Sequence, residues 1–259
     1  MRRGTWAETI ITKVLPPLVP FVIVATLAEV AVRLGWVRAF LVPAPSKVAR
    51  TLFTSSDLAI ALGQTSLASI IGFALSASVG LLLAILLSSS RWVQRALYPY
   101  AVLFQTVPII AIAPMLVIWI GYGISTVVAS AFIVSVFPVV ANSINGLLST
   151  DPALQDLFKL YGARPVSTLL KLRLPYALPS IFTGFRIAAG LSVIGAIVGE
   201  FITGSGLGGI IDESRTQQRI DKVFAVLLLA SALGIALFGL VNLASRLTLR
   251  NWHASERPE

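Results

Sequence analysis

The sequence predicts an all-α protein that crosses a lipid bilayer six times. Of its 259 residues, 56% are hydrophobic and only 12% are charged, whereas soluble domains have roughly 25% charged residues. The mean hydropathy is +0.89. A chain of this size cannot hide so much apolar surface in one core, so lipid is the expected solvent.

Six segments have about the 20 mostly apolar residues that a spanning helix requires. We expect the first to be retained in the membrane rather than cleaved as a signal peptide, because it is too long and no small-residue cleavage site follows it. Its Glu29 and Arg33 stand four residues apart and predict a local ion pair. The third and fourth are separated only by Gly121–Gly123, which predicts a helical hairpin. The expected spans are 14–34, 62–87, 99–120, 125–148, 178–201 and 223–243.

The segments between spans on the face opposite the termini are not plain loops. Residues 43–46 predict a rigid turn, and residues 47–53 predict an amphipathic stretch. The glycine run 204–209 predicts a flexible hinge or tight turn, followed by the polar run 212–222. A dinucleotide-binding interpretation of the glycines is disfavoured because no strand precedes them.

The net charge of +9 is explained by orientation in a membrane rather than by nucleic-acid binding. If both termini are cytoplasmic, twelve basic residues lie in inner segments and seven in outer segments, as the positive-inside rule expects. The inner residues are Arg2, Arg3, Lys13, Arg91, Arg95, Lys159, Arg164, Lys171, Arg173, Arg246, Arg250 and Arg257; the outer residues are Arg33, Arg38, Lys47, Arg50, Arg215, Arg219 and Lys222.

The expected cytoplasmic loop 149–177 contains a short amphipathic helix over about residues 152–161. Asp151-Pro152 is a typical helix start, and Gly162 is a typical stop. Leu154, Leu157, Phe158 and Tyr161 follow helical spacing and form one apolar stripe. The stripe lies either along the membrane or the protein's own bundle, or in a groove of another protein.

Gly162 and Leu172-Arg173-Leu174-Pro175, with nine residues between them, resemble the core of the EAA loop in membrane subunits of binding-protein-dependent ABC importers. The similarity covers about residues 60–250. Further segments resemble the nitrate/sulfonate/taurine branch, namely 105–108 through Pro114, 137–138 with Asn142, 184–187 and 199–200. The chain departs from the family where Asp156-Leu157-Phe158 replaces Glu-Ala-Ala.

The resemblance implies that this loop is a coupling helix docking on a cytoplasmic ATPase. The residues that it implicates are Leu154, Asp156, Leu157, Phe158, Tyr161, Gly162, Ala163, Leu174 and Pro175. It also implies two ATPase copies, a second permease copy in a homodimer, an extracytoplasmic binding protein and a bacterial inner-membrane location. Because the chain has no phosphate-binding loop, ATP and Mg²⁺ belong to the partner, and this chain is expected to hold no cofactor.

The implied substrate is a small anion of the nitrate, sulfonate or taurine type, with a thiamine-pyrimidine or riboflavin-type precursor as the alternative. The implied domains are 1–59, with the first span and the amphipathic stretch, the transporter domain 60–250, and a polar tail 251–259.

Four polar residues in the expected spans are candidates for the transport pathway: Gln105, Asn142, Arg186 and Glu200. Charges at membrane depth are costly unless paired or wetted. Arg186 either attracts an anionic substrate or has a structural role, which we favour. Glu200 either makes an interhelical contact or lines an outer gate. For Gln105 and Asn142, interhelical hydrogen bonding is the simpler role.

Other function classes are disfavoured. An intramembrane enzyme requires clustered acids, His or Cys, but the chain has no Cys and one His, so no catalytic or metal-binding residue is expected. An ATP-independent channel or carrier remains a distant alternative, and we find no internal repeat typical of such carriers.

Overall fold

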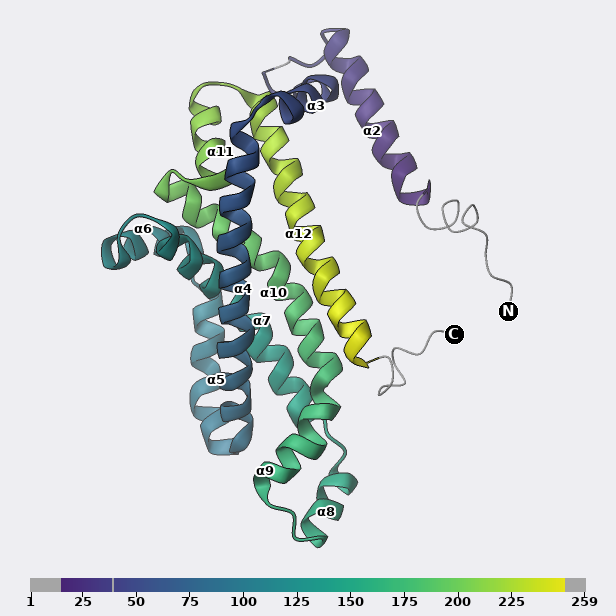
Figure 1. Cartoon of the computed structure of the whole chain (residues 1–259), viewed down its shortest axis with the longest axis vertical. Helices are drawn as coiled ribbons and strands as arrows, with labels where there is room; N and C mark the ends of the chain where they lie inside the picture. Colours follow the sequence, from purple (N-terminus) through teal and green to yellow (C-terminus); the bar gives the residue numbers. More distant parts are fainter. Residues whose placement is uncertain (1–14, 39, 250–259) are drawn as a thin grey trace, which may run out of the picture. The chain divides into compact units, whose positions relative to one another are not determined.

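The computed structural model describes residues 15–38 and 40–249, and the secondary structure of this part is helical without strands. Predictions for residues 1–14 and 250–259, including the polar tail, lie outside the described residues. Figure 1 shows the order of α2 Leu15–Arg33, α3 Pro45–Thr54, α4 Asp57–Ser89, α5 Arg91–Thr106, α6 Ile109–Ile120, α7 Ile124–Leu148, α8 Pro152–Leu160, α9 Pro165–Thr168, the π-turn η2 Leu169–Arg173, α10 Leu174–Thr203, α11 Gly206–Thr216 and α12 Ile220–Leu249.

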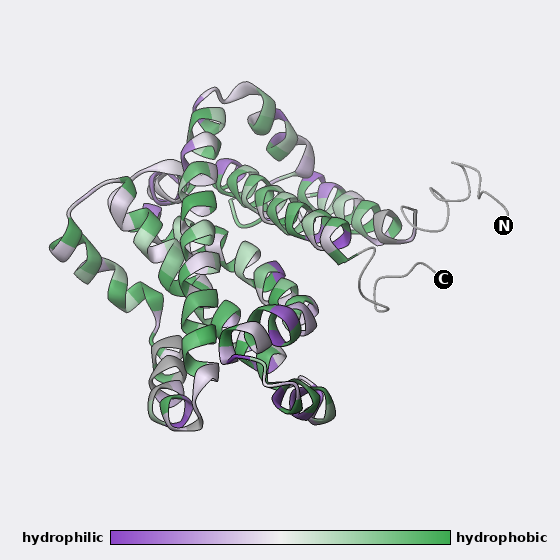
Figure 2. Ribbon diagram, turned by 60° about the horizontal axis from the view of Figure 1, so that its bottom comes forward, coloured by the Kyte–Doolittle hydropathy of each residue, from purple (hydrophilic) through white to green (hydrophobic). Residues whose placement is uncertain are grey.

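Four helical segments of the described part are long and apolar enough to cross a bilayer: Asp57–Ser89, Ile124–Leu148, Pro165–Thr203 and Ile220–Leu249. They contain the second, fourth, fifth and sixth expected spans. In Figure 2, hydrophobic residues run around the long helices rather than along one face. Such helices face apolar surroundings on all sides, either lipid or protein.

The third expected span is not one helix, and this prediction was wrong. α5 ends at Thr106 and α6 begins at Ile109, with Val107 and Pro108 in extended conformation between them. Proline has no amide hydrogen and disfavours helical geometry at the residue before it, so the pair ends α5. The predicted turn at 121–123 is present, and Gly121 and Gly123 adopt φ values of 95° and 128°.

The described chain divides into two compact units, and the first comprises the part before residue 59 together with 211–228. Here the amphipathic stretch forms α3, which begins earlier than expected because Pro45 occupies its first turn. Thr51 of α3 donates to Asp221 across 2.7 Å. The predicted ion pair is confirmed, with Arg33 Nε 2.7 Å from Glu29.

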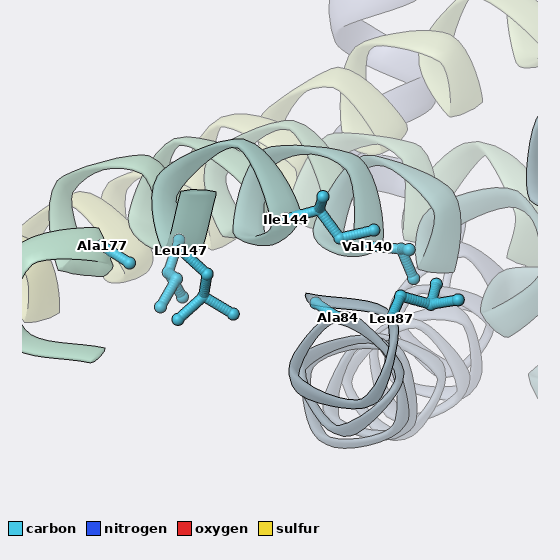
Figure 3. Packing of buried hydrophobic residues seen from close by; sticks show 7 residues of the cluster. Ala84, Leu87, Val140, Ile144, Leu147 and Ala177 are labelled. Atoms are coloured by element: carbon cyan, nitrogen blue, oxygen red, sulfur yellow. The ribbon is translucent and has the colours of Figure 1, made fainter. Parts of the chain in front are cut away.

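The second unit, 59–210 with 229–249 in the described chain, is built around α4, α7 and α10. Figure 3 shows Ala84 and Leu87 of α4 beside Val140 and Ile144 of α7. Small residues let these helices approach closely: a methyl group added at Gly195 of α10 would lie 2.7 Å from the Ser130 carbonyl oxygen of α7.

A buried hydroxyl contact adds polar pairing to this small-residue packing. Ser76 Oγ of α4 lies 2.6 Å from Ser135 Oγ of α7. In apolar surroundings, hydroxyl groups of neighbouring helices hydrogen-bond to each other. The three helices therefore combine close approach with hydrogen bonds inside the second unit.

Candidate functional site

The predicted short helix in the loop 149–177 is present as α8, and both of its ends are closed by local contacts. Asp151 accepts a hydrogen bond from the Ala153 amide across 2.8 Å, as an N-cap does. At the other end, the amides of Gly162 and Ala163 donate to the carbonyls of Lys159 and Phe158. Gly162 has φ +64°, so this is the C-terminal cap in which glycine tolerates the left-handed conformation.

The apolar stripe of α8 faces away from the described core, since no residue of α8 is buried. Leu154 and Leu157 are 39% and 44% exposed, and Tyr161 is 83% exposed, while Phe158 is half-buried. Exposed apolar residues grouped on one helix face are typical of an interaction surface. Asp156, at the acidic position of the loop, pairs with Lys159 of its own helix at 2.8 Å.

Residues 161–164 are not helical and connect α8 to the long segment Pro165–Thr203, in which α9, the π-turn and α10 are continuous. Leu174 packs on the hydrophobic cluster that contains Leu147 and Ala177. Pro175 and Pro179 do not interrupt the helix. Pro175 closely follows the π-turn within this continuous segment, and neighbouring helices and local π-type turns can accommodate a proline inside a membrane helix.

Arg186 makes a contact within the helix bundle. Its Nη2 donates to Ser245 Oγ of α12 across 2.8 Å, and Ser245 is fully buried. An arginine held by a neighbouring helix is what the structural interpretation predicts. The contact supports that interpretation over the role of attracting an anionic substrate.

Glu200 lies at the centre of a buried polar cluster that joins α4, α10 and the first turn of α11. The residue is 1% exposed. Thr65 Oγ1 of α4 lies 2.8 Å from both carboxylate oxygens, and the Gly208 amide donates to one of them across 3.1 Å. The Leu207 amide donates to Thr65 Oγ1 across 3.0 Å. These bonds support the interhelical alternative for Glu200.

The glycine run, expected to be a flexible hinge or a tight turn, forms a tight turn beside this cluster. Gly204 ends α10 in the left-handed conformation, with φ +72°, and α11 begins at Gly206. A Cβ atom at Gly206 would collide with the Glu200 carboxylate, and one at Gly208 would collide with the α10 backbone at Ile197. The alternative of a tight turn was correct: the glycines permit close packing.

The remaining pathway candidates are Asn142 of α7 and Gln105 of α5. Asn142 donates to the Pro138 carbonyl of its own helix across 2.8 Å, and Gln105 lies in α5, its side chain outside the described part of the chain. A cavity of about 330 Å³ opens where α5 breaks into α6. Its lining residues, none of them charged, are Thr106, Val107, Pro108, Ile109, Ile133, Val134, Phe137, Pro138 and Leu191.

The chain is similar to curated permeases over most of its length. It is 37% identical over 231 residues to the formylaminopyrimidine transport permease protein ThiX of Halalkalibacterium halodurans, covering 88% of this chain and 92% of that protein. It is 30% identical over 242 residues to the putative aliphatic sulfonates transport permease protein SsuC of Bacillus subtilis, covering 92% and 87%.

A solved structure shares the fold. The MetNI methionine ABC transporter, in an inward-facing conformation, aligns with a TM-score of 0.63 at 19% identity, over 75% of this chain and 95% of the matched chain. The family described as "Binding-protein-dependent transport system inner membrane component" matches residues 76–250. The chain therefore belongs to this family of multi-pass membrane permease subunits of ABC transporters.

Proposed function

We propose that this permease serves an ATP-driven importer and that α8 is the segment on which a separate cytoplasmic ATPase docks. The observation that carries this proposal is the exposed apolar stripe of α8, on a helix closed at both ends. A helix that is capped at both ends keeps its backbone in one conformation. It therefore loses little backbone conformational entropy when it docks in a partner groove. The continuous helix 165–203, which follows α8 after four non-helical residues, connects the loop to the bundle.

The assembly that we propose contains two copies of this chain, two ATPase chains and an extracytoplasmic binding protein. The family description names dependence on a binding protein. ATP and Mg²⁺ are bound by the ATPase, and both termini of the permease lie on the cytoplasmic side of a bacterial inner membrane. The excess of basic residues on that side supports this orientation.

Docking is tested by the same substitution at two leucines of α8. Leu157 belongs to the stripe, whereas Leu160, which is 85% exposed, lies outside it. We expect Leu157→Asp to reduce the amount of ATPase that co-purifies with the permease, because a carboxylate is costly to bury in an apolar groove. Leu160→Asp should leave it near the wild-type amount. Equal recovery in both variants would contradict docking through the stripe.

For the substrate, we propose an uncharged heteroaromatic compound related to formylaminopyrimidine. The higher identity to the formylaminopyrimidine permease supports this class. The uncharged lining of the cavity also supports it, and so does the contact that holds Arg186 to Ser245, because a charged solute requires compensating groups in a low-dielectric site.

An aliphatic sulfonate is the second candidate, favoured by the similarity to the sulfonate permease over 92% of this chain. Cells that express the complete importer should distinguish the two. We expect ATP-dependent uptake of labelled formylaminopyrimidine that excess taurine does not reduce. Uptake of taurine without uptake of the pyrimidine would overturn the first assignment and support the second.

A further inference from the structure

Arg173 connects the loop that carries α8 to two other helices. It is the last residue of the π-turn η2, directly before α10, and its side chain is half-buried. Its Nε donates to the Leu147 carbonyl across 3.1 Å, and its Nη2 donates to the Ser88 carbonyl across 3.2 Å. One guanidinium group therefore bonds to α7 and α4 at the same time.

Both carbonyls lie in the last turn of their helices, since α7 ends at Leu148 and α4 ends at Ser89. The last four carbonyls of an α-helix have no amide donor from the next turn, and they carry the partial negative charge of the helix end. A cation placed there is favourable. Arginine suits this position better than lysine, because its planar group offers several donors in fixed directions.

The Leu147 carbonyl also accepts a local hydrogen bond, from Thr150 Oγ1 across 3.5 Å, and two further carbonyls near the end of α7 are bonded only locally. Ser149 donates its amide to the Asn145 carbonyl across 3.0 Å and its hydroxyl to the Gly146 carbonyl across 2.9 Å. Both donors come from the residue that directly follows α7. Arg173, by contrast, comes from 26 residues along the chain, so its bond joins separate elements.

Apolar side chains pack around the two hydrogen bonds of Arg173. Leu147 is fully buried, and it belongs to the same cluster as Ala84 and Leu87 of α4 and Ala177 of α10 (Figure 3). Leu172, which precedes Arg173, is 9% exposed. The π-turn has the Leu174 amide bonded to the Leu169 carbonyl, a wider turn that is frequent at functional positions within α-helices.

We propose that Arg173 is a positioning residue that transmits movement of the α8 loop to the adjoining ends of α4 and α7. This inference rests on the proposed coupling role of α8. Arg173 does not itself dock the ATPase or contact the substrate. Without the two hydrogen bonds of Arg173, the loop still moves with the ATPase, but the ends of α7 and α4 move less when the loop moves.

The test measures the movement of the loop and of α7 separately. The chain has no Cys, so one introduced cysteine carries the only spin label on each permease. Val166 of α9, which is 65% exposed, reports on the loop, and Leu148, which is 44% exposed, reports on the end of α7. The complex with a cysteine-free ATPase is placed in lipid nanodiscs, and the distance between labels on the two permease copies is measured without nucleotide and after trapping with Mg-ATP and vanadate.

In the wild-type complex we expect both distances to change on trapping. Arg173→Ala should keep the Val166 shift and lose the Leu148 shift, and Arg173→Lys should retain part of the Leu148 shift. Lys171→Ala removes an exposed cation from the same turn and should behave as wild type. A merely structural role would reduce both shifts together, not the Leu148 shift alone.

An Arg173→Ala complex with both shifts at their wild-type size would overturn the proposal. If that variant does not assemble, the Arg173→Lys variant decides between the outcomes. A reduced Leu148 shift in this variant supports the transmitting role of Arg173, and a full shift overturns it. A wild-type complex in which the Val166 distance does not change would overturn the coupling role of α8, and the proposal with it. The experiment thereby distinguishes a failure of the proposed role of Arg173 from a failure of the proposed function of α8.

Discussion

Thr65 Oγ1 lies 2.8 Å from both carboxylate oxygens of Glu200, although 135 residues separate the two in sequence. Thr65 is fully buried, and Glu200 is 1% exposed. A buried carboxylate is costly unless hydrogen bonds satisfy it, so this contact and the Gly208 amide explain how Glu200 is accommodated. These hydrogen bonds also hold the first turn of α11 against α4 and α10.

Thr65→Val should therefore lower the stability of the permease by about 1–3 kcal/mol, because it leaves a buried acceptor with one donor fewer. The measurement is the unfolding midpoint in detergent. Thr183→Val is the matched control, since the Thr183 hydroxyl is exposed and bonds only to its own helix at Pro179. Equal midpoints for the two variants would contradict the role of the Thr65–Glu200 contact.

Substitutions at two glycines of the turn distinguish the stability cost of backbone strain from that of a steric collision. Gly204 and Gly206 both have positive φ, but only a Cβ atom at Gly206 meets the Glu200 carboxylate. Gly204→Ala should cost about 1–2 kcal/mol from the left-handed conformation alone. Gly206→Ala should lower the stability of the permease further, as measured by thermal denaturation. A loss of stability no larger than that of Gly204→Ala would argue against the close packing around Glu200.

Substitution of Gly162 should weaken the docking of the ATPase without a steric collision, because no atom lies within 4 Å of an added Cβ. The cost arises from φ +64°, at about 1–2 kcal/mol for most residues and less for Asn. We expect ATPase recovery to fall in the order wild type, Gly162→Asn, Gly162→Ala, Gly162→Val. Full recovery with Gly162→Val would show that the C-terminal cap of α8 is not needed for docking.

Arg186→Gln and Ser245→Ala should each reduce stability, and their effects should not add. Residues in direct contact commonly show coupling energies of about 0.5–3 kcal/mol in double-mutant cycles, and Arg186 donates to Ser245 across 2.8 Å. Uptake per folded permease should stay near the wild-type value in both variants. A loss of uptake with Arg186→Gln, but not with Ser245→Ala, would instead assign Arg186 to the pathway.

The fold class and α8 were predictable because they depend on local sequence. Long apolar segments require lipid or protein around them, and Asp151-Pro152 with Gly162 marks helix ends by backbone chemistry. The apolar stripe of α8 was predicted from the same local spacing, and the structure leaves Leu154, Leu157 and Tyr161 of this stripe exposed.

The break between α5 and α6 was missed because Val107-Pro108 lies within an apolar run. Proline is tolerated in many membrane helices, as Pro138 is in α7, so its presence alone does not identify a break. An interhelical contact was one of the two alternatives for Glu200, but the partners of Glu200 and the contacts of Arg173 were not predicted, for another reason. They join residues 26 to 135 positions apart, and such distances are set by helix packing rather than by local spacing.

The central claim, that α8 receives a separate ATPase, is tested most directly by purification of the wild-type chain from its native membrane in mild detergent. We predict recovery of the permease with an equal amount of a second chain that hydrolyses ATP, and loss of that chain from a Leu157→Asp preparation. A permease that transports its solute after purification with no ATPase chain would contradict the account.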